Sequence, residues 1–218
     1  MTVRVMLVSP ALGEAQRQVR FDGGESVDAG ALRQTRAVAA AVRAEVVRAD
    51  IVRTDTVRAD AAPAATRCYY GASARCRETA VALGLEAARA PELGDLDVGS
   101  WRGRTLDEVT EAEPRAVADW LADPASAPHG GESLHALIAR VGAWLDGRSA
   151  ETGRITAVVE PAVIRAALVH ALGLPAAVFW RLDVAPLSVT ELSGRAGRWN
   201  LRCGRPLGSG LSEGARRQ

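Results

Sequence analysis

The chain has 218 residues, of which 27 are arginine and none is lysine, and 26 acidic residues leave a net charge of +1. This length suits one α/β domain, or at most two small ones, and can bury a sizeable core without disulfide bonds or a structural metal. The arginines are scattered among acidic residues and form no basic block. The composition therefore gives little support to binding of nucleic acid or of a membrane surface.

The three cysteines, Cys68, Cys76 and Cys203, lack CxxC spacing. An odd number of cysteines argues against a disulfide framework or a zinc site and fits a reducing compartment. The first ten residues lack the long apolar stretch and cleavage site of a signal peptide, and no window approaches the length of a membrane span. These features predict a cytoplasmic protein, and no metal or cofactor is expected.

The first part of the chain alternates apolar runs with helical segments. Residues 3–8 form a run that predicts a buried strand, and the polar residues 12–27 predict a loop. Asp28 can cap a helix over residues 31–47. The pattern then predicts a strand, a helix and a loop with strand character: residues 66–70, 73–85 and 93–101.

The second part begins with two short helical patterns at residues 106–111 and 114–121, followed by a loop at 124–131. Ser133 can cap a helix over residues 134–147, whose apolar positions follow one stripe. The remaining predicted elements are a buried strand, a helix closed by a glycine and two strands joined by a turn: residues 155–159, 163–173, 187–192 and 198–203. Alternating strands and helices favour a single α/β domain over residues 1–207, with a flexible tail at 208–218.

The motif Val-Arg-x-Asp occurs three times at a period of five, starting at residues 47, 52 and 57. A period of five matches neither a strand nor a helix, and three copies are too few for a solenoid. The pattern favours an exposed linker or a short hairpin, and no function follows from it.

Four segments follow one another through the C-terminal two thirds: YYGASARCRETA, ELGDLDVGSWRG, PHGGESLHALIARV and VVEPAVIRAALVHALGLPAAVFWRLDVAPLSVTEL. Their order and spacing resemble the histidine phosphatase (phosphoglycerate-mutase-like) superfamily. The resemblance implies a three-layer α/β/α sandwich with a mostly parallel central sheet and a pocket above it. It also implies a small helical insertion at residues 105–128.

In that family a histidine on the first loop attacks phosphorus, while a second histidine and arginines hold the phosphate oxygens. By the resemblance, Arg75 matches the phosphate-binding arginine and Asp95 stands where a catalytic glutamate usually lies. Pro10 and Glu160 occupy the positions of the two histidines, and Ser9 that of the neighbouring arginine. The chain is therefore expected to be a degenerate member that is not a phosphohistidine phosphatase or mutase.

The exchange at position 160 also changes the charge of the site, because a carboxylate replaces a cation beside the phosphate. At ~4 Å, two like charges repel by roughly 4 kcal/mol at an effective dielectric near 20. A repulsion of this size could reverse a preference for phosphate.

Two functions fit this altered site. In the first, a repurposed enzyme uses Glu160 and Asp95 as a general base and acid on a small metabolite, with Arg75 holding a substrate carboxylate. Such an enzyme would fit a biosynthetic pathway, and it requires an open pocket with Glu160 unpaired. The alternative is a pseudoenzyme that binds a metabolite or a protein partner. That alternative predicts Glu160 locked onto Arg75, with Tyr70 or Trp101 filling the space.

Further candidate ligand contacts lie near these residues, each with a structural alternative. Tyr70 is as readily a core residue as a hydroxyl donor, Trp101 is expected at the pocket rim, and Glu132 is more readily a residue that ties down loop amides. The full set of substrate-binding candidates is Ser9, Glu14, Tyr70, Trp101, Glu132 and Ser133.

The histidines and the remaining cysteine positions have structural interpretations. His129 is expected on an exposed loop, and His135 and His170 on helices as packing or surface residues. Cys76 follows Arg75 without an obvious base, which favours a buried thiol over a nucleophile. The expected partner is a small molecule, and the resemblance allows a homodimer. A large exposed apolar patch would favour a scaffold protein instead.

Overall fold

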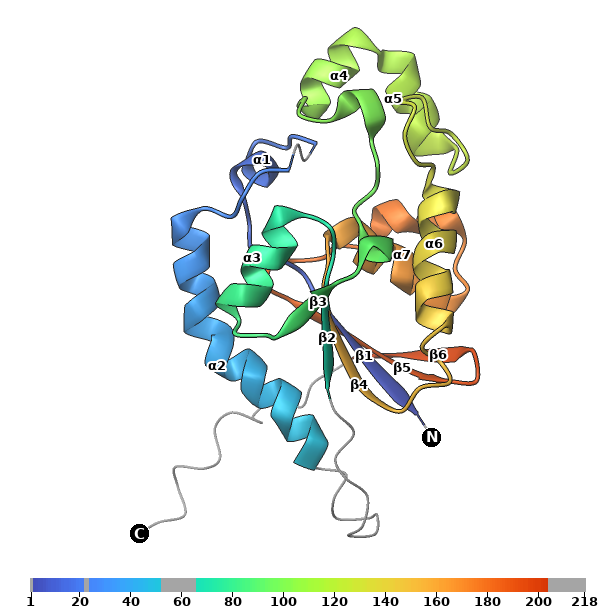
Figure 1. Ribbon diagram of the computed structural model, residues 1–218. Coiled ribbons are helices and arrows are strands. Elements are labelled where there is room, and N and C mark those ends of the chain that lie inside the picture. Colours follow the sequence, from blue (N-terminus) through green and yellow to red (C-terminus); the bar gives the residue numbers. More distant parts are fainter. Residues whose placement is uncertain (1, 22–23, 52–65, 204–218) are drawn as a thin grey trace.

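A six-stranded sheet forms the centre of the computed structural model, which describes residues 2–21, 24–51 and 66–203 (Figure 1). The strand order is β3-β2-β4-β1-β5-β6. Strands β1 to β4 are mutually parallel, whereas β5 runs antiparallel to both β1 and β6. The sheet is thus mostly parallel, as predicted. The strands are β1 (Val3–Val8), β2 (Arg67–Tyr70), β3 (Ala87–Arg89), β4 (Gly153–Val158), β5 (Val189–Arg195) and β6 (Arg198–Arg202).

The central strands β1 and β4 are apolar on both faces because helices cover both. Side chains alternate across a strand, so Leu7 and Ala157 enter the core under one pair of helices, while Val8 and Val158 enter the core on the other side. Strands buried on both faces appear as continuous apolar runs, which is why residues 3–8 and 155–159 were recognisable in the sequence.

Two pairs of helices form the outer layers (Figure 1). Helices α2 (Ala29–Ile51) and α3 (Ala74–Ala82) lie on one side, and α6 (Leu134–Asp146) and α7 (Pro161–Leu172) on the other. The predicted caps are present. Asp28 Oδ1 accepts from Ala31 N at 2.8 Å, Ser133 caps α6, and Gly173 ends α7 in the left-handed conformation with φ 61°. The three-layer α/β/α sandwich is confirmed.

Helices α4 (Leu106–Ala112) and α5 (Pro114–Ala122) lie together beyond one end of the sheet, at the top of Figure 1. Thr105 caps α4 by accepting from Glu108 N at 3.1 Å, while the Glu108 side chain accepts from Thr105 N at 2.7 Å. Pro114 occupies the first turn of α5, where its missing N–H costs nothing. Both helices lie within the segment expected to form the helical insertion.

Several short elements differ from the predictions. The predicted loop at 12–27 contains the one-turn helix α1 (Glu14–Arg17). The segment 93–101 contains no strand; it holds the last residue of the 3-10 turn η1 (Pro91–Leu93) and all of the 3-10 turn η2 (Gly99–Trp101). The edge strand β3 and the 3-10 helix η3 (Ala176–Arg181) were not predicted. Elements of three to six residues carry too little periodicity to be recognised in one sequence.

The first Val-Arg-x-Asp copy continues helix α2, so the linker or hairpin prediction is wrong for residues 47–50. The second and third copies lie outside the described residues, as does the tail at 208–218.

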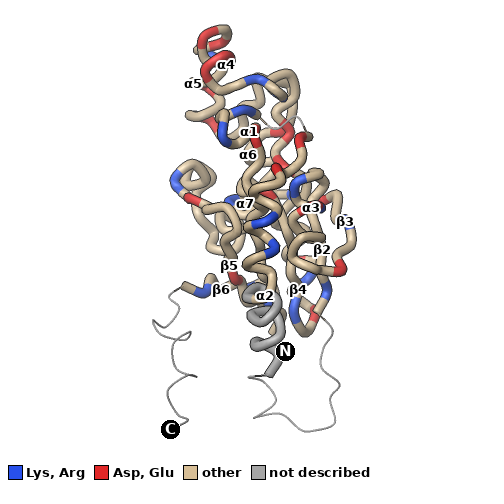
Figure 2. Tube along the Cα trace, turned by 90° about the vertical axis from the view of Figure 1, so that its left-hand side faces the viewer, with Lys and Arg blue, Asp and Glu red and all other residues tan. Residues whose placement is uncertain are grey.

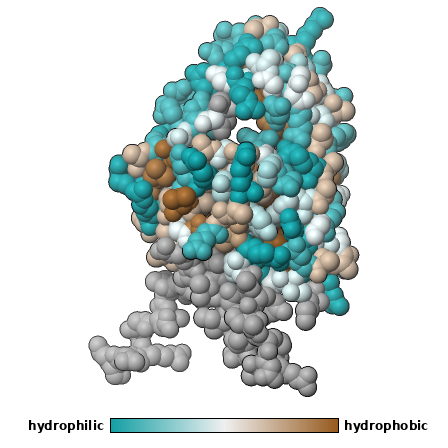
Figure 3. All heavy atoms as spheres, viewed as in Figure 1, coloured by the Kyte–Doolittle hydropathy of each residue, from teal (hydrophilic) through white to brown (hydrophobic). Residues whose placement is uncertain are grey.

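The described surface mixes both charges and exposes few large apolar side chains. Basic and acidic positions are interspersed along the chain (Figure 2). Brown side chains gather around α2 and α3 on the face shown in Figure 3. Val81 of α3 is 71% exposed. The other exposed large apolar residues, Val19, Leu121 and Leu172, lie on different elements. No large apolar patch favouring a scaffold is therefore evident in the described part, and none of its helices is long and apolar enough to cross a membrane.

Candidate functional site

A buried ion pair joins the first turn of α3 to the start of α7. Arg75 and Glu160 are only 4% and 1% exposed. Arg75 Nη2 bonds Glu160 Oε2, and Arg75 Nε donates to Glu160 Oε1 at 3.3 Å, so the fork of the guanidinium grips both carboxylate oxygens. Glu160 lies two residues after the end of β4 and is the N-cap residue of α7, although its side chain makes no capping bond.

Two further side chains of α3 contact the same carboxylate. Ser73 Oγ donates to Glu160 Oε1 at 2.7 Å and also caps α3 by accepting from Cys76 N at 3.1 Å. The Cys76 thiol lies 3.5 Å from Glu160 Oε1. Both oxygens of the Glu160 carboxylate are therefore contacted, by the guanidinium and, at Oε1, also by a hydroxyl and a thiol. These contacts offset part of the free-energy cost of burying the carboxylate charge.

The first loop closes the other side of the ion pair. Ala11 O accepts from Arg75 Nη1 at 3.2 Å, and Ala11 N donates to Thr79 Oγ1 at 3.1 Å. Ser9 is 1% exposed, and its hydroxyl has no hydrogen-bond partner among the described residues. Ser9 is therefore close-packed in this structure, and it does not line the pocket described next.

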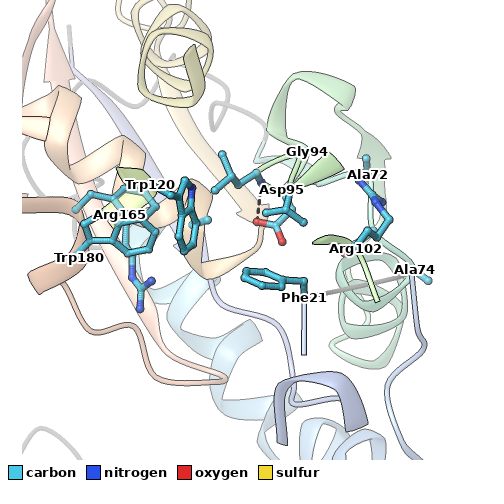
Figure 4. A pocket seen from close by; sticks show the side chains of 15 residues that line it. Phe21, Ala72, Ala74, Gly94, Asp95, Arg102, Trp120, Arg165 and Trp180 are labelled. Carbon is cyan, nitrogen blue, oxygen red and sulfur yellow. Dashed lines mark hydrogen bonds between the residues drawn. The ribbon is translucent and has the colours of Figure 1, made fainter. Parts of the chain in front are cut away.

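A pocket of about 570 Å³ lies beside the ion pair (Figure 4). Its volume falls within the range typical of small-molecule sites. Ser73 lines the pocket and also bonds Glu160, so it links the two, whereas Arg75 and Glu160 are not lining residues. Seven of its fifteen lining residues are aromatic or charged: Phe21, Trp120, Phe179, Trp180, Asp95, Arg102 and Arg165.

Asp95 is the predicted catalytic residue that does line the pocket. Its Oδ1 accepts from Leu96 N at 2.9 Å, and in Figure 4 its carboxylate lies above Phe21 and to the right of Trp120. Burial and Glu160 are the main causes that raise the pKa of Cys76, and the charge of Asp95 adds to them. Arg102 is held on the pocket edge by Asp97, at 3.1 Å.

Three of the other candidates are structural in this fold. Tyr70 packs in the core beneath α3, and Trp101 is fully buried, so neither fills or borders the pocket. The rim position expected for Trp101 is wrong because the η2 turn directs its ring inward, where Nε1 donates to Glu113 at 3.2 Å. Glu14 lies on the exposed side of α1 and pairs with Arg17.

The Gly-Gly-Glu-Ser turn also has a structural role. Arg140 donates to both oxygens of Glu132, at 2.9 and 2.7 Å, and to backbone carbonyls of the segment that carries Asp95. Glu132 thus holds a loop through Arg140 and does not face the pocket, and Ser133 caps α6. Gly131 is required by space, since a Cβ there would lie 2.1 Å from Asp97 O.

The expectation for His129 is wrong, because this side chain is 2% exposed. Its ring lies 5.0 Å from that of Trp101, and Nδ1 accepts from Gly131 N at 3.0 Å. His135 is exposed, as expected for a surface residue, and His170 Nε2 lies 3.0 Å from Asp146 Oδ2 at the surface. The described residues contain no group of three or more His, Cys, Asp or Glu side chains placed to hold a metal ion.

Residues 53–204 match the model of the histidine phosphatase superfamily, branch 1. This match spans more than half of the chain. The chain belongs to the histidine phosphatase superfamily.

Sequence relatives in this superfamily match only part of the chain. A bifunctional protein of Mycobacterium tuberculosis is 34% identical over 127 residues, covering 54% of this chain and 34% of that protein. Glucosyl-3-phosphoglycerate phosphatase of Mycolicibacterium vanbaalenii is 32% identical over 116 residues, covering 46% and 51%, and phosphoserine phosphatase 1 of Hydrogenobacter thermophilus is 31% identical over 123, covering 54% and 58%. The matches thus span about a third to three fifths of these relatives' lengths.

Solved structures extend the likeness of fold to nearly the whole chain. A structure titled mycobacterial hydrolase 1 has a TM-score of 0.75 at 22% identity, covering 93% of this chain and 98% of the other. A mycobacterial glucosyl-3-phosphoglycerate phosphatase complexed with VO3 has a TM-score of 0.71 at 23% identity, covering 91% and 96%. At these identities the likeness concerns the fold of the histidine phosphatase superfamily.

Sequence reasoning missed most of the pocket wall of this histidine phosphatase homologue. Phe21, Trp120 and Trp180 come from three distant segments, and only the folded chain brings them together. Arg165 was visible in the segment VIRAALVHALG, yet nothing in a helical stripe distinguishes a pocket arginine from a surface one. The one feature of the sequence that sets Arg165 apart is that it is a charged residue in the first turns of a helix that is otherwise largely apolar.

We expect Cys76 to resist alkylation in the native protein at about pH 8, a little below the ordinary thiol pKa. Burial and the Glu160 carboxylate raise the pKa of this thiol well above its usual value, and the thiolate is the reactive form. Peptide mapping after brief iodoacetamide treatment should find the exposed Cys203 labelled and Cys76 unlabelled until the protein is denatured. Equal labelling of Cys76 and Cys203 in the native state would contradict the burial of Cys76 against Glu160.

We expect stability to fall as pH drops from about 7.5 to about 5.5, partly because of His129. Burial lowers the pKa of His129, an effect that the Asp97 carboxylate partly offsets. Below the usual histidine pKa the unfolded chain then binds more protons than the folded one, so acidification favours unfolding. Urea midpoints at the two pH values should differ less in His129→Asn, whose amide oxygen can accept from Gly131 N. If the urea midpoints of His129→Asn differ between the two pH values as much as those of the unsubstituted protein, His129 does not contribute to the loss of stability at low pH.

Proposed function

We propose that this histidine-phosphatase-fold protein binds a small organic ligand in the pocket and performs no phosphohistidine chemistry. The observation that carries the proposal is the buried Arg75–Glu160 pair. The guanidinium that matches the phosphate-binding arginine already holds a carboxylate at both of its oxygens. Its charge is therefore neutralised before any ligand arrives.

Phosphoryl transfer requires a nucleophile and cations spread around an anionic transition state. By the resemblance, Pro10 stands at the position of the nucleophile, and proline has no reactive side-chain group. Arg102 is engaged by Asp97. Releasing Arg75 for a phosphate group would leave Glu160 as a buried, unpaired carboxylate next to a second anion. Burial of the unpaired charge and repulsion between the two anions would both be unfavourable.

The same contacts favour ligand binding over an acid/base enzyme built on Glu160. A general base must reach the proton that it removes, within about 3 Å or through one water. Glu160 is 1% exposed, does not line the pocket, and accepts from Arg75 and Ser73. Asp95 is the acidic side chain that does line it. The pseudoenzyme alternative is accordingly the better supported, with the difference that the pocket is open and neither Tyr70 nor Trp101 fills it.

Relatives named as phosphatases support a competing function, phosphomonoester hydrolysis. The decisive test is release of inorganic phosphate from p-nitrophenyl phosphate by the purified full-length chain between about pH 5 and 8, where side-chain acids and bases change charge. We expect no release above a protein-free blank. Turnover that is lost in Asp95→Asn would establish hydrolysis in this pocket and overturn the proposal, whereas turnover that persists in Asp95→Asn would point to a contaminant.

A further inference from the structure

We infer that the ligand is an aromatic carboxylate, whose carboxyl group binds Arg165 and whose ring packs on the wall formed by Trp120 and Trp180. This inference rests on the proposed ligand-binding function and concerns the same pocket. Its experiment is arranged so that either idea can fail alone.

Arg165 is fixed in place before a ligand binds. Its Nε donates to Leu182 O at 2.7 Å, and its guanidinium carbon lies 5.8 Å from the centre of the Phe179 ring. Neither Nη1 nor Nη2 has a partner among the described residues, and the side chain lines the pocket. A guanidinium anchored through Nε still offers parallel N–H donors, and it loses little side-chain freedom when a carboxylate binds.

The wall beside Arg165 is aromatic and rigid. Trp120 and Trp180 pack edge to face with ring centres 4.6 Å apart, and Phe179 packs on Trp180 at 5.0 Å. Phe21 braces Trp120 from another segment at 5.9 Å. Aromatic faces arranged in this way favour a planar apolar group, and packing of such pairs contributes beyond the area they bury. The ligand part next to the arginine is therefore a ring.

The charges of the pocket select a carboxylate over a phosphate dianion. Of the arginines at or beside the pocket, Arg75 is paired with the buried Glu160, and Arg102 bonds Asp97 at the exposed edge. Nη1 and Nη2 of Arg165, in contrast, have no partner among the described residues. One guanidinium balances one negative charge. Trp120 lies between Arg165 and Asp95 in Figure 4, so the anionic group and Asp95 lie at different ends of the pocket.

The test is calorimetric binding of three isosteric probes to the full chain: 3-phenylpropanoate, 3-phenylpropan-1-ol and 3-phenylpropylamine. We expect the carboxylate to bind at least about tenfold more tightly than the alcohol, since a charge-assisted bond to a guanidinium is the stronger kind. In Arg165→Gln the two should bind within about twofold of each other, and Arg165→Lys should be intermediate because it lacks the planar fork. Propanoate, which lacks the ring, should bind weakly.

Arg181→Gln is the matched control, because Arg181 is an exposed arginine on η3 that does not line the pocket. It should preserve the preference for the carboxylate, and thermal unfolding should verify that all variants are folded. Tighter binding of the alcohol or the amine, binding of none of the probes, or an unchanged preference in Arg165→Gln would overturn this inference while leaving the proposed function in place. Hydrolysis of phenyl phosphate that is lost in Asp95→Asn would instead overturn the proposed function.

Discussion

Glu160→Gln should lower the free energy of unfolding by about 3–5 kcal/mol, because removal of one partner leaves the other charge buried without compensation. Arg75 is 4% exposed, and apart from Glu160 it bonds only the Ala11 carbonyl among the described residues. The amide of glutamine keeps the shape of the side chain but loses the charge. Urea unfolding followed by circular dichroism measures the difference.

The matched control is Glu14→Gln, which removes a carboxylate from an exposed ion pair with Arg17. Little change is expected, because solvent screens such pairs. The double variant Arg75→Leu with Glu160→Leu should recover most of the stability lost by Glu160→Gln, since apolar residues often replace a buried ion pair at small cost. It also stays informative if Glu160→Gln does not fold. A loss below about 1 kcal/mol in Glu160→Gln would show that the pair is not buried as described.

Trp101→Ala should cost about 3–5 kcal/mol of stability, the range typical of truncating a fully buried aromatic residue. The Trp101 ring contacts three others, with centres 5.7 Å from Phe21, 5.4 Å from Trp120 and 5.0 Å from His129. The change also removes the donor that bonds Glu113. Thermal unfolding and urea unfolding provide the measurement.

Leu121→Ala is the control for Trp101→Ala, since Leu121 is a large apolar residue of α5 that is 49% exposed. A surface truncation of this kind should change stability by no more than about 0.5 kcal/mol. A similarly small effect of Trp101→Ala would contradict the buried position of Trp101 and support the predicted position at the pocket rim. Phe21 and Trp120 line the pocket and pack against Trp101, so Trp101→Ala should weaken the binding of 3-phenylpropanoate as well as the stability of the fold.

The fold was predictable where local chemistry and tertiary structure agree. Residues 3–8 and 155–159 are mostly apolar because both faces of their strands are covered. Asp28 and Ser133 begin helices, and Gly173 ends one, through contacts within a few residues. Edge strand β3 could not be recognised, because its Ala-Ala-Arg sequence owes its conformation to pairing with β2.

The site was predictable only in part. The positions of Arg75 and Glu160 indicated an inverted charge, but the sequence could not decide whether the two would pair. Their pairing depends on how α3 and α7 meet at the end of β4, which is a tertiary property. Trp101 was misplaced for the same reason, since a tryptophan in a turn can face either the core or solvent and only packing decides.

The Arg75–Glu160 pair also constrains how this chain can change over generations. A single substitution of Glu160 by histidine would leave the Arg75 charge buried without its carboxylate partner, at a cost of about 3–5 kcal/mol out of a total stability of about 5–15 kcal/mol. A substitution at Arg75 alone would likewise leave the Glu160 carboxylate buried without its cationic partner. Each residue thereby disfavours replacement of the other, so an exchange at either position without a large loss of stability is expected to require a change at both.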